Sequence, residues 1–157
     1  MKGQFVFEFL IAGIIFFAIV LYAMNFLNAN VSDFRGKFYM DKLQSKALQI
    51  SEILGNDKSS ISLVEGPSLF NISKIRNFNA TYCNGGYTQL RRDFDLIEKT
   101  EYGDRMHNIN ITLTSESGTY VLDCGYTIPA GTEKAEIERL GVLNENNELV
   151  KLRVIVW

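Results

Sequence analysis

The feature that most constrains this chain is a long apolar run close to its amino terminus. From Phe5 to Leu27 the only charged residue is Glu8. At about 1.5 Å per residue, an α-helix over these roughly 23 positions spans ~34 Å. The hydrocarbon core of a bilayer is about 30 Å thick. The run therefore predicts a single membrane-spanning helix at the start of the chain.

A secretory signal peptide is the alternative interpretation of this run. Only Met1, Lys2 and Gly3 stand where such a peptide carries its positively charged region. The apolar run is longer than the ~7 to 15 residues typical of a signal peptide, and no small-x-small cleavage site is evident after it. These features favour a helix that remains in the mature protein.

Two details are unusual for a helix that only anchors a protein. A carboxylate in lipid costs about 2.5 to 3.5 kcal/mol on insertion scales unless it finds a partner, so the presence of Glu8 needs a reason. Gly3-Gln4 places a small residue before a polar one just ahead of the apolar run. This step is a suitable place for a protease to cut.

The order Lys2-Gly3-Gln4, then Glu8, then an unbroken apolar stretch resembles the class III signal peptide of archaeal type IV pilin-like proteins. Val6 and Ala12 stand where that family often has Ser and Leu. The resemblance implies that a prepilin peptidase cuts between Gly3 and Gln4 on the cytoplasmic side of the membrane. The apolar helix then stays in the mature protein, which begins at Gln4.

The resemblance also suggests a role for Glu8 in assembly. Cleavage frees an α-amine on Gln4, and Glu8 would compensate such an amine on a neighbouring subunit as helices enter a filament. The attraction between the two charges grows as lipid or protein replaces water. The alternative is that Glu8 reaches back to the nearby cytoplasmic interface.

The charges flanking the run and the rest of the chain disagree about orientation. Lys2 precedes the run, whereas Arg35, Lys37, Lys42 and Lys46 follow it, so a positive-inside count places the large part in the cytoplasm. Four N-glycosylation acceptor sequences favour the outside instead, since they are useful only there. They begin at Asn30, Asn71, Asn79 and Asn110.

The two cysteines of the chain, Cys83 and Cys124, also suit an oxidising compartment. An even pair in a small domain predicts one disulfide, and free buried thiols are the alternative. A bond across 41 positions would stabilise the fold by about 4 kcal/mol on the chain-entropy model.

Helical spacing continues beyond the apolar run in two stripes. The first contains Leu27, Val31, Phe34 and Phe38, and the second contains Met40, Leu43, Ala47, Ile50 and Leu54. At 100° per residue the stripes point roughly 180° apart. We expect the first to face neighbouring subunits or the membrane interface and the second to pack on the protein's own head. Gly36 permits a bend or local unwinding between them, or a kink that realigns one continuous core stripe.

The helix should end near Gly55-Asn56, and short β-rich segments follow. Residues 109–114 and 119–126 predict one hairpin, and residues 135–143 and 149–157 predict a second. Residues 132–140 could instead form a short helix, and residues 87–94 predict a small one. We therefore expect an α+β fold of the type IV pilin-like kind, with a long amino-terminal helix against a small twisted antiparallel sheet of four or five strands.

Several functional classes have no support in the residues. The net charge of −2 argues against a nucleic-acid partner. His107 is the only histidine, has no metal-ligand spacing around it, and is expected to be a solvated residue at a strand edge. No nucleophile elbow or phosphate-binding loop is present. The sequence thus predicts no enzyme, no cofactor and no metal site.

Together these features predict a structural subunit, a minor pilin or pilin-like protein, of an archaeal type IV pilus-like surface filament. Residues 1–3 would be the cleaved leader, 4–28 the membrane and filament-core helix, 29–54 its outer half, and 55–157 an extracellular β-rich head. The resemblance implies prepilin peptidase, other pilin subunits, an assembly ATPase with its platform protein, and membrane lipid as partners. The alternative function is a membrane-anchored cell-surface binding protein that does not polymerise.

Overall fold

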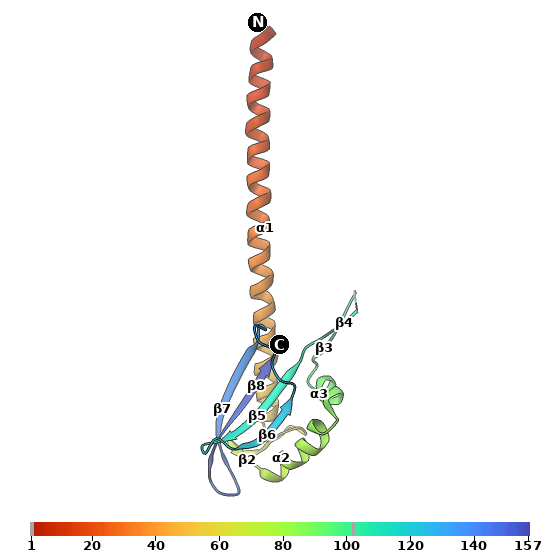
Figure 1. The fold of residues 1–157 in the computed structure, drawn as a ribbon, viewed down its shortest axis with the longest axis vertical. Helices are drawn as coiled ribbons and strands as arrows, with labels where there is room; N and C mark the ends of the chain where they lie inside the picture. Colours follow the sequence, from red (N-terminus) through yellow and green to blue (C-terminus); the bar gives the residue numbers. More distant parts are fainter. Residues whose placement is uncertain (1, 102) are drawn as a thin grey trace. The chain divides into compact units, whose positions relative to one another are not determined.

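The computed structural model describes the backbone of residues 2–101 and 103–157, and the side chains of 7–31, 34, 36–99, 101 and 103–157. The chain divides into two compact units, Met1–Tyr39 and Met40–Trp157. Helix α1, Lys2–Leu54, supplies the whole described part of the first unit and the opening segment of the second (Figure 1). We call the second unit the head unit.

Helix α1 is long because nothing in its sequence interrupts it. Both prolines of the chain, Pro67 and Pro129, lie beyond its end, and proline is the residue that most strongly breaks a helix. The backbone is α-helical at Gly36, so the local unwinding considered there does not occur. The helix ends at Leu54, directly before Gly55-Asn56, as predicted. Gly55 N donates to Ser51 O over 3.0 Å and closes its last turn.

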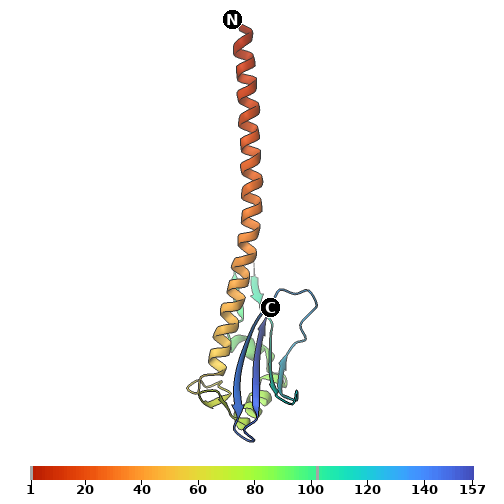
Figure 2. The ribbon, with the colours of Figure 1, turned by 90° about the vertical axis from the view of Figure 1, so that its left-hand side faces the viewer.

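The head unit contains a sheet of six strands in the order β1-β2-β7-β8-β5-β6, and a separate pair β3-β4 (Figures 1 and 2). The strands of the large sheet are β1 Val64–Gly66, β2 Leu69–Phe70, β5 Ile109–Ser115, β6 Tyr120–Gly125, β7 Ala135–Leu143 and β8 Leu149–Val156. The separate pair is β3 Ile97–Thr100 and β4 Gly103–Met106. The helices are α2 Ile72–Phe78, the π-helix η1 Asn79–Cys83 and α3 Tyr87–Asp93.

Both predicted hairpins are present. Strands β5 and β6 pair antiparallel, and so do β7 and β8. The helix considered for residues 132–140 is wrong, because Ala135 to Leu140 lie in β7 and pair with β8 along their length. Pairing with β8 satisfies the backbone groups that face it and buries alternate side chains, and this outweighs the helix preference of alanine, glutamate and arginine. The small helix predicted over residues 87–94 is confirmed as α3.

The sheet is larger than the four or five antiparallel strands that the sequence predicts. Strands β1 and β2 are three and two residues long, too short to show a period of two. Strand β2 also pairs parallel with β7. Its backbone bonds include Val142 N to Ser68 O over 2.8 Å and Asn144 N to Phe70 O over 2.9 Å. The fold is nonetheless α+β, with the sheet mostly antiparallel and packed against the end of α1.

The core of the head unit lies between α1 and one face of the sheet. The second stripe of α1 is buried there at Leu43, Ala47, Ile50 and Leu54. The residues of β5 that alternate inward, Ile109, Ile111 and Leu113, are fully buried, as are Leu152 and Val154 of β8. The prediction that this stripe supports the protein's own head is confirmed. Figure 2 shows the last turns of α1 running beside β7 and β8.

Arg139 of β7 fastens the end of α1 to the sheet. Its Nε donates to the Oγ of the buried Ser51 over 3.0 Å. Its guanidinium also lies 3.8 Å from a carboxylate oxygen of Glu52. A positive charge beside the last turn of a helix interacts favourably with the partial negative charge of the unsatisfied carbonyls there. The contact therefore helps to set where the helix stops.

The β3-β4 pair is held to α1 by two ion pairs. Lys42 Nζ lies 2.6 Å from Glu98 Oε2, and Lys46 Nζ lies 2.5 Å from Asp95 Oδ2. The hydrogen bond that Lys46 donates to Asp95, together with its positive charge, lowers the pKa of Asp95. Burial acts to raise the pKa of Glu98, but the hydrogen bond and charge of Lys42 bring it below its ordinary value. Two of the four basic residues that follow the apolar run thus serve the fold of the head unit.

His107 corrects a sequence prediction, because the structure buries it to 2% exposure instead of leaving it at a solvated edge. It lies between β4 and β5, where its backbone N donates to Leu96 O over 2.9 Å. Its Nε2 is 3.5 Å from Glu98 Oε1. Burial lowers the pKa of His107; the Glu98 charge acts in the opposite direction, and Arg105 and Lys42 add to the lowering.

This burial predicts that acidification destabilises the head unit. Because its pKa is lowered in the fold, the imidazole binds a proton less readily there than in the unfolded chain, where its pKa is near the ordinary 6.5. Stability from His107 is therefore full above pH 6.5 and is lost as the pH falls toward its lowered folded pKa. Melting temperatures measured between about pH 8 and pH 5 should fall more for the native chain than for His107→Gln. Equal slopes for the two proteins would contradict this account.

Candidate functional site

Between Phe7 and Leu27 the surface of α1 is apolar apart from Glu8 and Asn25. Most of its large apolar side chains there are more than 40% exposed, and Phe9 reaches 82%. They are Phe7, Phe9, Leu10, Ile11, Ile14, Ile15, Phe16, Phe17, Ile19, Leu21, Tyr22, Met24, Phe26 and Leu27. A contiguous patch of this size requires cover by lipid or by protein. The segment is long and apolar enough to cross a membrane.

Glu8 lies within this surface, between the exposed rings of Phe7 and Phe9. Among the side chains that the structure describes, none forms an ion pair with it, and its own side chain is exposed. The predicted cleavage site lies four residues earlier, where the backbone of Gly3 and Gln4 is helical. Their side-chain surroundings and Met1 of the predicted leader lie outside the described residues. Glu8 is thus a carboxylate in an apolar surface that would need a partner once that surface is covered.

The apolar face extends past the predicted span. Val31, Phe34 and Phe38 are 45%, 71% and 62% exposed. The rings of Phe34 and Phe38 lie 6.5 Å apart, nearly parallel, on one side of the helix. From Phe7 to Phe38 the helix rises about 46 Å, at ~1.5 Å per residue. A hydrocarbon core of about 30 Å would cover this length only at a tilt of about 50°, outside the ~0 to 40° seen for membrane helices.

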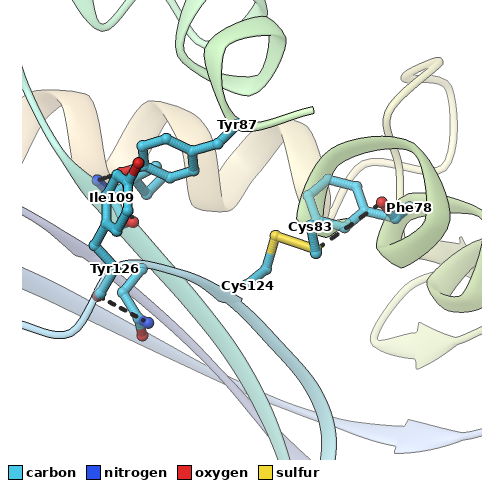
Figure 3. The surroundings of a disulfide bond; sticks show 7 residues. Phe78, Cys83, Tyr87, Ile109, Cys124 and Tyr126 are labelled. Atoms are coloured by element: carbon cyan, nitrogen blue, oxygen red, sulfur yellow. Dashed lines mark hydrogen bonds between the residues drawn. A yellow bond between two sulfur atoms is a disulfide. The ribbon is translucent and has the colours of Figure 1, made fainter. Parts of the chain in front are cut away.

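The predicted disulfide is present and joins η1 to the edge strand β6. The Cys83 and Cys124 sulfurs are 2.11 Å apart, and their Cα atoms are 5.0 Å apart (Figure 3). Nearby, the Tyr87 hydroxyl accepts from Ile109 N over 2.9 Å and lies 3.1 Å from Ile109 O. The Tyr126 ring contacts that of Tyr87 edge-on at 4.4 Å. These contacts attach the η1–α3 segment to the same side of the sheet.

The four predicted glycosylation acceptors have different surroundings. Asn30 lies on α1, where its Nδ2 donates to Phe26 O over 2.8 Å. Asn71 caps α2, because its Oδ1 accepts from Ser73 N and Lys74 N and its Nδ2 contacts Glu65. Asn79 opens η1, close to the disulfide. Asn110 lies on β5, with its Nδ2 3.4 Å from Tyr126 O. The three acceptors of the head unit lie at three different elements, α2, η1 and β5.

The sequence did not predict a groove of about 720 Å³ on the face of the sheet that points away from α1. We call it the outer-face groove. Alternation along β5 places Asn110, Thr112 and Thr114 on this face. The register adds Arg153 and Lys151 from β8 and Asp123 and Tyr120 from β6. The alternation was visible in the sequence, but the cross-strand register that assembles the groove was not.

Among the described residues, no group of three or more His, Cys, Asp or Glu side chains is placed to hold a metal ion. Comparison of the chain with protein-family models, with curated proteins and with solved structures finds no match. The candidate functional site therefore rests on the geometry of α1: an apolar face from Phe7 to Phe38 that is longer than the hydrocarbon core of a membrane and that includes the exposed carboxylate of Glu8.

Proposed function

We propose that this chain is a structural subunit of an archaeal type IV pilus-like surface filament, assembled through α1. In this proposal a prepilin peptidase cuts between Gly3 and Gln4, and an assembly ATPase and platform protein move the subunit from the membrane into the filament. The observation that supports it best is the exposed apolar face from Phe7 to Phe38, which is longer than the hydrocarbon core of a bilayer. The α1 helices of neighbouring subunits would cover it.

Glu8 has a specific place in this proposal. In a bundle of α1 helices it would lie in a region where protein replaces water, and there an unpaired carboxylate is costly. The α-amine of Gln4 on a neighbouring subunit is a cation that cleavage creates at the right end of the helix. Pairing the two charges would stabilise the assembly of processed subunits and not of unprocessed ones, which lack this amine.

The Cys83–Cys124 disulfide supports a head outside the cytoplasm, since such bonds persist in oxidising compartments. The membrane-anchored protein that does not polymerise would share this location. The two candidate functions differ in what covers Phe34 and Phe38: a neighbouring helix in a filament, or the membrane interface in a lone anchor. That difference defines the experiment.

In cells that make the filaments, the double variant Phe34→Ser with Phe38→Ser should be lost from sheared filaments and remain in the membrane fraction. The substitutions remove apolar area that a neighbouring helix would cover in a filament, while the segment before Leu27 still anchors the chain. Lys37→Ser is the matched control, because it shortens an exposed side chain of the same turn without removing an apolar one. Glu8→Ala should behave like the double variant in the same assay.

Amino-terminal sequencing of the filament fraction provides the second readout, with a chain that begins at Gln4 as the expected result. Normal incorporation of the Phe34/Phe38 variant would remove the main support for assembly. Native protein found only in the membranes of cells with normal filaments would favour the non-polymerising binding protein.

A further inference from the structure

The side chain of Asn110 points into the outer-face groove. In the register of the sheet, Asn110 stands opposite Gly125 of β6, which carries no side chain, and opposite Ile155 of β8. Thr112, the third residue of the acceptor sequence, is two positions along β5 and lines the same groove. Both residues that define the acceptor therefore face an open space of about 720 Å³.

We propose that Asn110 carries an N-linked glycan and that the first sugars of this glycan lie in the outer-face groove. The proposal requires a head outside the cytoplasm, which the proposed function shares, but it does not require filament assembly. It assigns the groove one occupant, a saccharide attached to Asn110, which itself lines the groove. A second copy of the chain or a diffusible ligand would compete for the same surface.

The bonding around Asn110 is compatible with this modification. In the transfer, Nδ2 forms a bond to C1 of the first sugar, the bond from C1 to the phosphate of a lipid-linked oligosaccharide donor breaks, and Nδ2 loses one proton. The remaining N–H can keep the 3.4 Å interaction with Tyr126 O. The sugar would take the direction of the lost hydrogen, and Gly125, which stands opposite Asn110 in the register, has no side chain that could block it.

The other acceptors lack such a space. A sugar on Asn71 would compete with the Nδ2 contact to Glu65 in the cap of α2. Asn30 lies on the exposed surface of α1, where its Nδ2 is bonded to Phe26 O. Thr81 lines a smaller cavity of about 330 Å³, but Asn79 does not. Among the described acceptors, Asn110 is the one whose amide and hydroxyl partner share a groove.

The groove offers both kinds of contact that a saccharide uses. Beside Asn110 along β5, Thr112 has Arg153 on one side and Asp123 on the other, which supply hydrogen-bond donors and acceptors. Two residues further, Tyr120 and Leu140 line the groove with exposed apolar side chains. The row of the sheet that contains them, with Thr114 and Lys151 between them, lies about 13 Å from Asn110 along the strand, at ~3.3 Å per residue. The first few sugars would reach it and cover it with their C–H faces.

Mass spectrometry of the full-length protein from membranes of its native cells tests the modification. The peptide that contains Asn110 should carry a hexose-based mass increment. Asn110→Gln and Thr112→Ala should both remove it, and Thr112→Ser should retain it, because serine also completes an acceptor sequence. An unmodified Asn110 in protein whose Cys83–Cys124 bond has formed would overturn the proposal, since that bond shows export.

Acylation of surface lysines tests where the glycan lies. Lys151 lines the groove and its side chain is 39% exposed, whereas Lys58 lies in an exposed loop outside it. With the glycan present, Lys151 should react severalfold more slowly than in Thr112→Ala, and Lys58 should react equally in both. Rates at Lys151 that are equal in the two proteins and as fast as at Lys58 would show that the glycan leaves the groove uncovered and would overturn this part. Slow acylation that persists in Thr112→Ala would identify another occupant, such as a second copy.

Discussion

Replacing Cys83 and Cys124 together with serine should lower the free energy of unfolding of the head unit by about 4 kcal/mol. The bond links positions 41 residues apart. Without it, the unfolded chain regains the conformational freedom of that loop, and the folded state gains nothing in return. At about 4 to 8 °C for each kcal/mol in a domain near this size, the melting temperature should fall by more than ~10 °C.

The position of the disulfide adds a local effect to this loss. Strand β6 is an edge strand, paired with β5 alone, and η1 approaches it at the disulfide (Figure 3). We therefore expect the α2–η1–α3 segment to exchange its amide hydrogens faster than β5 and β8 once the bond is absent. Hydrogen exchange of native and double-serine protein would measure this difference.

Trp157 provides a convenient probe for the same experiment. It is the only tryptophan of the chain, it is buried, and its backbone N and O bond to Asn108 over 3.1 and 2.8 Å. Its fluorescence in detergent-solubilised full-length protein therefore reports unfolding of the head unit. Reduction of the native protein should reproduce the variant's stability without releasing the chain from membranes. An unchanged denaturation midpoint after reduction would contradict the assigned role of the bond.

Leu43→Ala should destabilise the head unit by about 2 to 5 kcal/mol, because it leaves a cavity in a closely packed core. The Leu43 side chain is 1% exposed, on the stripe of α1 that faces the sheet. The change removes contacts that alanine cannot replace, while it slightly raises the intrinsic helix preference of the position. A large loss would therefore come from tertiary packing and not from the helix itself.

Leu48→Ala is the matched control on the same helix. Leu48 is 46% exposed, so its truncation should change the free energy of unfolding by no more than about 0.5 kcal/mol. Chemical denaturation followed by Trp157 fluorescence would compare the two variants. Similar losses for both would mean that α1 does not form the core of the head unit by the face proposed. Both variants should still insert in membranes, because neither lies in the apolar segment.

Local patterns in the sequence were sufficient to predict the elements in which buried and exposed side chains alternate with a regular period. The stripe from Leu43 to Leu54 repeats with the period of a helix, and the alternation from Ile109 to Leu113 repeats with the period of a half-buried strand. Both hairpins, the end of α1 at Leu54 and the apolar segment follow from such patterns. With two cysteines, the pairing of Cys83 with Cys124 needed only an oxidising environment.

The tertiary structure alone decided the features that depend on contacts between distant residues. His107 is buried beside Glu98 of β3 and Leu96, and this stretch also forms ion pairs with α1, from Glu98 to Lys42 and from Asp95 to Lys46. The parallel pairing of β2 with β7 joins residues more than seventy positions apart, through strands too short to have a recognisable period. The outer-face groove exists because the register places Asn110 beside Gly125 and Thr112 between Arg153 and Asp123.

The long apolar helix shows both sides of this division. Its existence and its length follow from the sequence, because an unbroken apolar run without proline has few alternatives to a helix. The structure added which parts of α1 the protein covers by itself. Leu43 to Leu54 are covered by the sheet, whereas the face from Phe7 to Phe38 remains exposed. The hydrophobicity of a side chain predicts that it will be buried. Only the tertiary structure decides whether the same chain buries it or whether lipid or another protein must.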